Sequence, residues 1–352
     1  MEITYTSDVF LTAYFVYVSG EQLGLAKAEI AALSSLTRID GEVSWDGRLG
    51  LINALESPVP FILERAALVK EAGIVLVEIG ARDNLFDHLS DDTVLDAIKS
   101  EETFSVRTIS ENSNFSVDER LELEKRLGKY IKRTVSAGVD LKSPQVRFIV
   151  ILNRNHIRLC KAVGSKLRPM LREREPGRKP FFHPSMMNAT LARVMCNLAC
   201  VMPDEIVLDP FCGGGGILCE AFLIGAKSVG VDLNWQLLTG SRQNLSLIGS
   251  DYNVVQGDVR HLPVHECDCI VTDPPYGRAS STRGARAIGL VESLFERADA
   301  ILRRRDESIC ICGSSEMNLR DLAESKGLVV SQFLQIRVHR GLVREILSIG
   351  FQ

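Results

Sequence analysis

Residues 206–216, IVLDPFCGGGG, decide how the second half of the chain folds. The apolar run 206–208 predicts a buried strand, and Asp209 ends it. Glycines 213–216 follow; because they carry no Cβ atoms, they let the backbone approach a ligand closely and lead into a helix N-terminus. We therefore predict a ligand-binding loop formed by Asp209, Pro210, Phe211, Cys212, Gly213 and Gly215.

Two kinds of ligand suit a glycine loop that follows a strand. A dinucleotide fingerprint, GxGxxG, would here require glycine at positions 213, 215 and 218, and position 218 is Leu. Asp209 would repel the pyrophosphate of a dinucleotide, whereas its carboxylate can receive an ammonium group. This favours S-adenosylmethionine, whose methionine part carries an ammonium, as the cofactor.

Two more acidic residues end apolar runs further along the chain. Asp232 comes sixteen residues after Gly216. A carboxylate at the end of a second strand can accept hydrogen bonds from both hydroxyls of a ribose. NAD would require the same carboxylate, so Asp232 indicates a nucleoside and not one particular cofactor. Asp258 could accept a hydrogen bond from the adenine amine, with a simple turn as the alternative. Leu233 and Val259, which follow these two carboxylates, complete the predicted cofactor site.

Residues 269–277, CIVTDPPYG, predict the chemistry. Two prolines fix the backbone and remove two amide donors, so the loop offers acceptors, namely the Asp273 carboxylate and the Pro274 carbonyl. The exocyclic amine of a nucleobase has two N–H donors that fit this pair. Tyr276 supplies a flat face on which the base can stack. We therefore predict methyl transfer to a base amine, with Asp273, Pro274, Pro275 and Tyr276 as the catalytic residues and Asp273 also in contact with the cofactor.

Apolar runs that alternate with helical patterns after residue 206 predict a parallel sheet in an α/β domain. The runs 328–338 and 342–349 are separated by His339, Arg340 and Gly341 and predict a hairpin that closes this sheet.

The first half of the chain predicts an α+β arrangement. Two capping boxes are expected to begin helices, one formed by Ser19 and Gln22 and the other by Ser116 and Glu119. Strands are expected at 11–18, 74–79, 103–108, 146–152 and 156–160, the last two as a hairpin.

Composition indicates an ordinary globular protein, since 45% of the 352 residues are hydrophobic and 24% are charged. The formal net charge of -4 argues against a nucleic-acid partner when the chain is taken as a whole. The charge is uneven, however. Residues 154–179 hold nine Lys or Arg against two Glu, a local balance of +7. Such a stretch is either a solvated linker or a surface that contacts phosphates, and we favour the second.

The nine cysteines and the N-terminus predict a cytoplasmic protein. The cysteine spacings suit burial in strands and one helix better than disulfides or a metal site. Residues 1–10 have neither a basic region nor an apolar core, so we expect no signal peptide.

The runs TFSVRT, RLGKYI, VDLKSP and RFIVIL, in this order, resemble a THUMP domain over roughly residues 60–162. That family binds RNA, chiefly tRNA. The strings DPFCGGGGILCEA, VGVDLN, QGDVRHLP, TDPPYGRAS and VHRGLVREI extend the resemblance to archaeal tRNA guanine-N2 methyltransferases, which modify guanosine 10.

This resemblance implies a Rossmann-fold class I methyltransferase domain with a seven-stranded sheet, preceded by ferredoxin-like and THUMP modules. The expected parts are a ferredoxin-like module at 1–59, the THUMP-like domain at 60–162, a basic linker at 163–180 and the methyltransferase domain at 181–352. Residues expected to contact RNA are Lys142, Lys166, Arg168, Arg172, Arg178, Lys179 and Arg340. His183 is expected either near the cofactor or in packing at a helix entry.

The resemblance also bears on partners. Some relatives, mainly eukaryotic, work with a small zinc-binding activator that adds a strand to the methyltransferase sheet, and residues 252–255 would be the exposed edge strand here. We expect tRNA as the substrate, no membrane partner, no metal site, and a monomer or heterodimer. An enzyme that acts on another RNA position or on DNA, and an RNA-binding protein without catalysis, are the alternatives.

Overall fold

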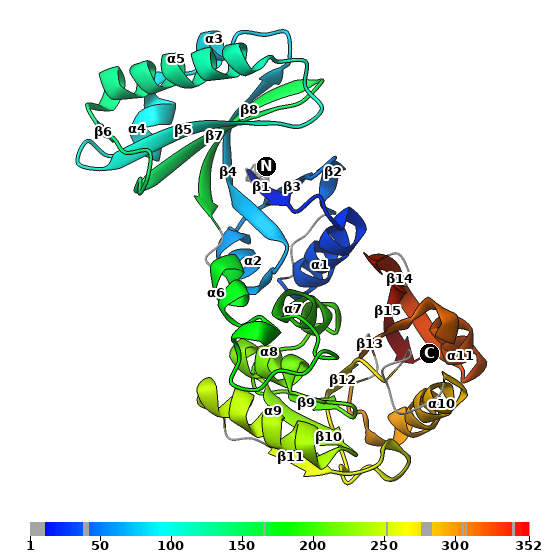
Figure 1. Ribbon diagram of the computed structural model, residues 1–352. Helices are drawn as coiled ribbons and strands as arrows, with labels where there is room; N and C mark the ends of the chain where they lie inside the picture. The colour runs from blue at the N-terminus through cyan, green and yellow to red at the C-terminus, as the bar shows by residue number, and fades with distance from the viewer. Residues whose placement is uncertain are drawn as a thin grey trace, which may run out of the picture. The chain divides into compact units, whose positions relative to one another are not determined.

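The computed structural model describes residues 11–37, 42–164, 167–250, 253–275, 284–304, 306, 308–339 and 342–351. The chain divides into two compact units (Figure 1). Unit 1 comprises Met1–Gly20, Arg38–Leu63 and Val69–Ser165, and unit 2 comprises Glu21–Thr37, Glu64–Leu68 and Lys166–Gln352. No helix in the described part of the chain is long and apolar enough to cross a membrane.

Unit 1 is built on an eight-stranded mixed sheet with the strand order β2-β3-β1-β4-β8-β7-β5-β6. Its strands are β1 (Thr12–Val18), β2 (Ser44–Asp46), β3 (Leu49–Ala54), β4 (Val69–Gly80), β5 (Thr103–Ser110), β6 (Gly138–Val139), β7 (Val146–Leu152) and β8 (His156–Gly164). Its helices are α3 (Leu85–His88), α4 (Asp91–Ala97) and α5 (Val117–Val135), while α2 (Val59–Arg65) runs into unit 2. The five strands expected from the sequence are therefore confirmed, and β7 and β8 form the expected antiparallel hairpin.

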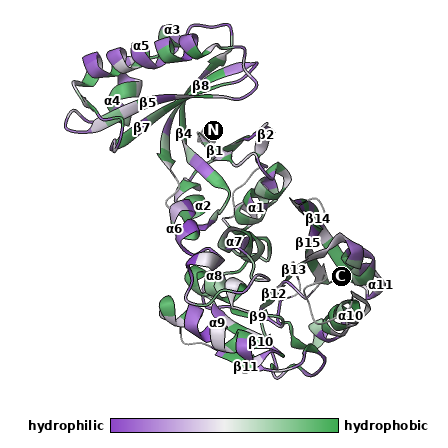
Figure 2. Ribbon diagram, in the orientation of Figure 1, coloured by the Kyte–Doolittle hydropathy of each residue, from purple (hydrophilic) through white to green (hydrophobic). Residues whose placement is uncertain are grey.

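Helix α5 shows why this segment folds as it does. Ser116 accepts a hydrogen bond from the backbone N–H of Glu119, whose side chain accepts one from the N–H of Ser116, so the predicted capping box is confirmed. Leu127 and Ile131 are buried on its apolar face against the sheet. Figure 2 shows both hydrophobic and hydrophilic residues along α5, as this one-sided burial requires.

The first predicted capping box is wrong. Helix α1 (Leu23–Leu36) begins after Gln22, which makes no side-chain capping bond. A box between Ser19 and Gln22 would have begun the helix three residues earlier. Burial, and not a cap, holds this helix, because Leu25, Ile30 and Leu33 are all in the core.

The structure also places α1 differently from the expected four-part division. Strand β4 pairs with both β1 and β8, so the strands of the expected ferredoxin-like and THUMP-like modules share one sheet. Helix α1 belongs to unit 2, although its sequence lies within the expected first module. The boundaries at 59, 162 and 180 stay predictions.

A buried polar network fixes α1 within unit 2. The Glu29 carboxylate is fully buried and accepts hydrogen bonds from the N–H groups of Ala67 and Leu68 at 2.8 and 2.9 Å. Asn197 donates to Glu29 at 2.8 Å and accepts from the Arg65 guanidinium. Burial raises the pKa of Glu29, and these donors lower it, so the network offsets part of the desolvation of the carboxylate.

Unit 2 contains a seven-stranded sheet with the order β11-β10-β9-β12-β13-β15-β14. Its strands are β9 (Ile206–Asp209), β10 (Lys227–Asp232), β11 (Asn253–Gln256), β12 (Cys269–Thr272), β13 (Ile309–Ser314), β14 (Leu328–His339) and β15 (Leu342–Phe351). The neighbours from β11 to β13 are parallel, and β15 is antiparallel to both β13 and β14. The expected parallel sheet and closing hairpin are confirmed.

Helices cover both faces of this sheet (Figure 1). Besides α1, the helices of unit 2 are α6 (Leu167–Glu173), α7 (Ala189–Leu198), α8 (Gly216–Ile224), α9 (Trp235–Leu247), α10 (Gly284–Ile301) and α11 (Leu319–Ser325). Alternation along β15 shows the two faces: Leu347 and Ile349 pack in the cluster of α10 and α11, whereas Ser348 between them donates to the Leu198 carbonyl of α7.

The basic stretch is partly used inside the protein. Arg174 donates to both carboxylate oxygens of the buried Glu220 on α8, at 2.8 and 3.0 Å. Arg158 forms a similar pair with Glu78 in unit 1. Two of the nine cations are thus held by carboxylates of the protein, so the free positive charge at this stretch is smaller than the sequence count. All nine cysteines are free thiols and buried, as expected.

Candidate active site

The predicted carboxylates gather at one edge of the sheet in unit 2. Asp209 and Asp232 are the last residues of β9 and β10, and Asp273 directly follows β12. These three strands are neighbours, so their carboxyl ends meet at the same edge. In an open α/β sheet, ligands bind at this edge.

The glycine loop between β9 and α8 has two kinds of glycine. Gly213 and Gly215 have φ values of +49° and +77°, a region that favours glycine. A Cβ on Gly215 would lie 2.4 Å from the Ser241 hydroxyl, and one on Gly214 would lie 2.6 Å from the Met186 sulfur. A Cβ on Gly213 would meet only the Phe211 carbonyl, at 4.0 Å. Gly213 therefore leaves space for a ligand to approach the backbone. Gly214 and Gly215 are glycines because neighbouring side chains leave no space for a Cβ atom.

Asp232 holds this loop from the neighbouring strand. Its Oδ2 accepts a hydrogen bond from the Gly213 N–H at 2.8 Å, and its Oδ1 accepts one from the Asn234 N–H at 2.8 Å. Burial raises the pKa of Asp232, and these backbone donors lower it. The adjacent Leu233 is 67% exposed, an apolar surface beside the carboxylate.

Asp209 is more deeply buried, at 2% exposure. Its Oδ1 accepts hydrogen bonds from the Thr272 hydroxyl at 2.6 Å and from the Phe211 N–H at 3.1 Å. Burial raises the pKa of Asp209 to about 7, and the Asp232 and Asp273 carboxylates add to the rise while the two donors lower it. An ammonium group nearby would offset this desolvation.

The other residues of the predicted loop lie mostly in the interior. The side chains of Pro210 and Cys212 are buried, and Phe211 packs partly buried against the core. The Cys212 N–H donates to the Val231 carbonyl at 3.0 Å. Pro210, Phe211 and Cys212 thus fix the backbone conformation of the loop.

Asp258, the predicted partner of the adenine amine, also makes contacts within the protein. It caps the short helix Val259–His261 through the Arg260 N–H, and its Oδ2 is 2.5 Å from the Arg260 guanidinium. The hydrogen bond from Arg260 lowers the pKa of Asp258 to about 2. An adenine amine would share this carboxylate with Arg260, and Val259 contributes its side chain to the core. The adenine contact stays a prediction.

The Asp-Pro-Pro loop begins where β12 ends. Asp273 is 13% exposed, Pro274 is buried and Pro275 is partly buried. Tyr276 lies outside the described residues. Arg344 of β15, which the sequence did not single out as a site residue, places its Nη2 atom 3.8 Å from Oδ2 of Asp273.

A clamp joins the glycine loop to the segment that carries His183. Asn244 of α9 donates to the carbonyls of Gly214 and Phe181, at 2.9 and 3.2 Å, and accepts from the Phe181 N–H at 3.0 Å. His183 itself is 2.7 Å from the Ser185 hydroxyl through Nδ1. His183 thus stabilises its own turn, and Asn244 is a residue that sequence reasoning missed.

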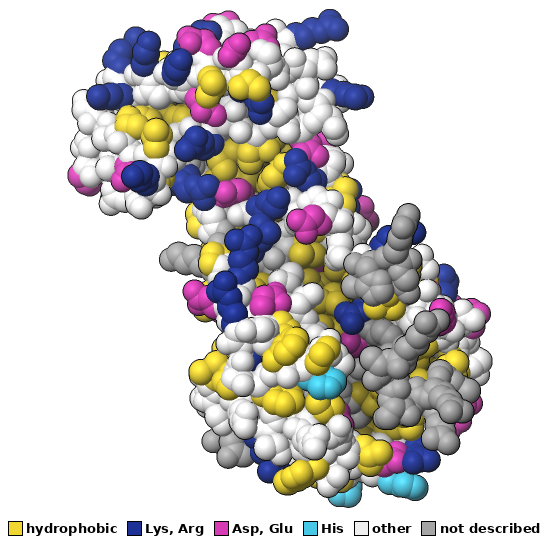
Figure 3. Space-filling model, viewed as in Figure 1, with side chains coloured by type: hydrophobic (Ala, Val, Ile, Leu, Met, Phe, Trp, Pro, Cys, Tyr) yellow, Lys and Arg dark blue, Asp and Glu magenta, His cyan; other side chains and the backbone are white. Residues whose placement is uncertain are grey.

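The predicted RNA contacts differ in accessibility. Lys142, Arg172 and Arg178 are exposed, and Arg168 is partly exposed, with a pKa lowered by burial and by Arg172. The Lys179 ammonium is buried, so it does not face solvent in this structure. The remaining two, Lys166 and Arg340, lie outside the described residues. Figure 3 shows Lys and Arg side chains over α6 and over the region of α5.

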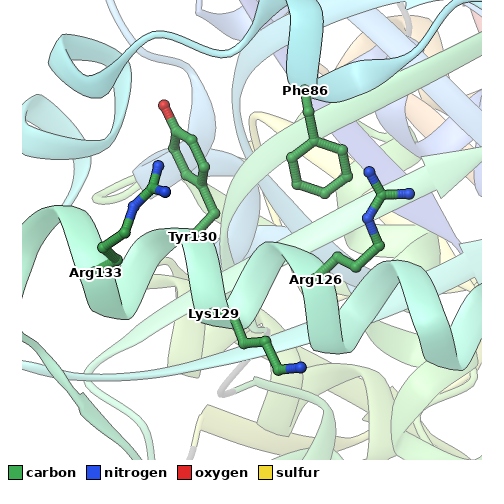
Figure 4. A pocket seen from close by; sticks show the side chains of 5 residues that line it. All are labelled: Phe86, Arg126, Lys129, Tyr130 and Arg133. Carbon is green, nitrogen blue, oxygen red and sulfur yellow. The ribbon is translucent and has the colours of Figure 1, made fainter.

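Unit 1 contains a basic pocket on α5 that the sequence did not reveal. It has a volume of about 270 Å³ and is lined by Phe86, Arg126, Lys129, Tyr130 and Arg133 (Figure 4). The Arg126 guanidinium lies 4.3 Å from the Phe86 ring centroid, and that of Arg133 lies 5.4 Å from the Tyr130 centroid. Cations beside aromatic faces suit a polyanion with flat bases.

Two family models identify a THUMP domain followed by a methyltransferase domain in this chain. The family described as RMKL-like, methyltransferase domain, matches residues 176–346, and the THUMP domain family matches residues 89–160. Because it is 32% identical to a curated tRNA (guanine(10)-N2)-dimethyltransferase of which it covers 97%, the chain belongs to that family.

Curated relatives carry this assignment. The chain is 32% identical to the tRNA (guanine(10)-N2)-dimethyltransferase of Methanothermobacter thermautotrophicus over 94% of this chain and 97% of that protein. It is 29% identical to the protein of the same name from Methanocaldococcus jannaschii, with the same coverage. The crystal structure of TrmN from Thermus thermophilus superposes with a TM-score of 0.58 at 20% identity, covering 97% of this chain and 100% of that one, and shows the shared fold.

Proposed function

We propose that the chain transfers a methyl group from S-adenosylmethionine to the N2 amine of guanosine 10 in tRNA. The observation that carries this proposal is the position of the Asp273-Pro274 loop, at the sheet edge where Asp209 and Asp232 also end their strands. The relatives above are named for this reaction. The THUMP domain favours tRNA over DNA, and the intact Asp209, Asp232 and Asp273 favour catalysis over RNA binding alone.

The residues present fit S-adenosylmethionine. The Asp232 oxygens accept backbone N–H groups from Gly213, Asn234 and Leu233. A carboxylate has about four lone-pair sites, so it can still accept a hydrogen bond from a ribose hydroxyl. Asp209 would receive the ammonium, whose charge favours the ionised carboxylate. The open side of Gly213 admits the ligand beside the backbone. When bound, the cofactor supplies an activated methyl group on a sulfonium.

The Asp-Pro-Pro loop would prepare the amine. The lone pair of guanine N2 is delocalised into the ring, which makes it a poor nucleophile. Hydrogen bonds from N2 to the Asp273 carboxylate and the Pro274 carbonyl would localise that lone pair and aim it at the methyl group. They would strengthen as positive charge develops on nitrogen. The proton then leaves to Asp273 or to water, and the base must leave its stack to reach the loop.

The tRNA would be held by cations in both units. In unit 1 these are the α5 pocket and Lys142, and in unit 2 they are the exposed arginines of the basic stretch, Arg172 and Arg178. Phosphate contacts of this kind give affinity that falls steeply with salt.

A small zinc-binding partner is proposed as a second component. Strand β11 is an end strand of the sheet, as the edge prediction requires, and its Asn253, Val255 and Gln256 are exposed. An added strand would pair with this edge. Full activity of the purified chain alone, with no small protein in the purified material, would exclude the requirement.

Methylation of tRNA transcripts with labelled cofactor tests the function. Each guanosine is replaced in turn, and we expect label to be lost only when guanosine 10 is replaced. Asp273→Ala should remove the label from every transcript. Nucleoside analysis of the product then distinguishes one methyl group from two.

A further inference from the structure

Arg344 lies beside the catalytic loop because of the sheet topology. Strand β15 is antiparallel to β13, and Arg344 pairs with Ser314, the last residue of β13. The first residues of β15 are therefore at the carboxyl edge of the parallel strands, where Asp273 follows β12. The 3.8 Å contact joins two side chains that are only 16% and 13% exposed, so solvent screens it weakly.

The Asp-Pro-Pro loop does not by itself choose a base. Two acceptors suit the exocyclic amine of adenine, cytosine or guanine equally well. The bases differ next to that amine. On guanine, the same edge carries the O6 acceptor and the N1–H donor, whereas adenine presents an acceptor at N1 and its amine at position 6. Selection of guanine thus requires a donor placed near the acceptor that receives the amine.

We propose that Arg344 is a specificity-determining residue that selects guanine by donating to O6, while Asp273 receives the N2 amine. This inference rests on the proposed function. The planar fork of a guanidinium can donate to a carboxylate and to a carbonyl oxygen beside it. Adenine held by its amine at Asp273 would present a C–H group where guanine has O6, so it could not accept this hydrogen bond, which disfavours that base.

A purely catalytic role for Arg344 is disfavoured by its charge. Positive charge develops on the amine nitrogen during methyl transfer, and a cation close by opposes that change. A guanidinium at O6 is separated from the amine nitrogen by the N1 side of the ring, so it opposes this change less. The contact with Asp273 also places the carboxylate and the guanidinium side by side. Both groups can then bind the same edge of one guanine, at N2 and at O6.

A transcript with 2-aminopurine at position 10 tests the assignment, because this base keeps the 2-amino group and lacks O6 and the N1–H; the change of preference in an Arg344 variant then isolates the part that depends on Arg344. We compare kcat/KM for guanine and 2-aminopurine with the wild-type enzyme and with Arg344→Gln. The wild type should prefer guanine. Arg344→Gln should lower the rate on guanine but not on 2-aminopurine, so the preference falls about tenfold or more.

Arg344→Lys, which keeps the charge and loses the fork, should lose part of the preference. Arg337→Gln is the matched control, since Arg337 is an exposed arginine of the neighbouring strand β14, and it should keep the wild-type preference. Equal slowing on both bases in Arg344→Gln would overturn the assignment and leave Arg344 as a positioning residue for Asp273. A wild-type enzyme that leaves guanine 10 unmethylated would instead overturn the proposed function itself.

Discussion

The Thr272 hydroxyl donates a 2.6 Å hydrogen bond to Oδ1 of Asp209, and both residues are almost completely buried. This bond joins the last residue of β12, next to the Asp-Pro-Pro loop, to the last residue of β9, next to the glycine loop. The predicted substrate and cofactor loops are thus linked through one buried pair.

Thr272→Val removes the hydroxyl while keeping the size of the side chain. Leaving the buried Asp209 carboxyl without this donor should destabilise the protein by about 1–3 kcal/mol. The pKa of Asp209 should rise further, because the hydroxyl lowers it. Chemical denaturation measures the first effect. Thr272→Ser keeps the donor and is the control; equal stability of Thr272→Val and wild type would show that the bond contributes nothing.

Asp209 makes the stability of the unliganded protein depend on pH. Its pKa is about 7 in the folded protein, against an ordinary value of 3.8. Between these values the folded state binds more protons than the unfolded state, so this group lowers stability as pH rises from 4 to 7. Asp209→Asn should therefore gain stability relative to wild type over that range, by about 4 kcal/mol at most. A difference between the two proteins that is constant with pH would contradict this account.

Asn244→Ala should loosen the glycine loop. The substitution removes three hydrogen bonds that join α9 to Gly214 and Phe181. We expect weaker binding of S-adenosylhomocysteine, measured by calorimetry, and a KM for the cofactor that rises more than kcat falls. The neighbouring Gln243 is exposed, so Gln243→Ala should bind like wild type. Unchanged affinity in Asn244→Ala would show that these hydrogen bonds do not contribute to cofactor binding.

Lys129→Ala tests the α5 pocket as an RNA surface. Lys129 is exposed and lines the pocket, whereas the two arginines there also lie beside aromatic rings. Loss of one phosphate contact should weaken tRNA binding at low salt and reduce the slope of log K against log salt by about 1. Lys132 lies on the same helix and does not line the pocket. If Lys132→Ala lowers the slope equally, the effect belongs to general charge and not to the pocket.

Local chemistry made much of the fold predictable. The period of the apolar residues located the strands of the second sheet and five of the eight strands of the first, and missed β2, β3 and β6. Ser116 with Glu119 located the start of α5, since these signals act over a few residues. Long-range burial explains the failures. Glu29 binds backbone groups at positions 67 and 68 and thereby assigns α1 to unit 2, which no pattern near α1 indicates.

The candidate site was predictable where a carboxylate ends a strand, as with Asp209, Asp232 and Asp273. Arg344 was not predictable, because it lies about 70 residues after Asp273 in the sequence. The antiparallel pairing of β15 with β13 brings the two residues together. Thr272 and Asn244 also escaped notice, since a hydroxyl before the loop and an amide within a helix have no distinctive spacing.

The proposed reaction is methyl transfer to the N2 amine of guanosine 10 at the Asp273 loop. A tRNA with inosine at position 10 tests it most directly, because inosine differs from guanosine only in lacking that amine. Labelled methyl transfer is measured on this tRNA and on the matched tRNA with guanosine 10. We expect methyl label on the guanosine tRNA and none on the inosine tRNA. Equal label on both tRNAs would show that the methyl group is transferred to another position, and it would contradict methylation of N2 at guanosine 10.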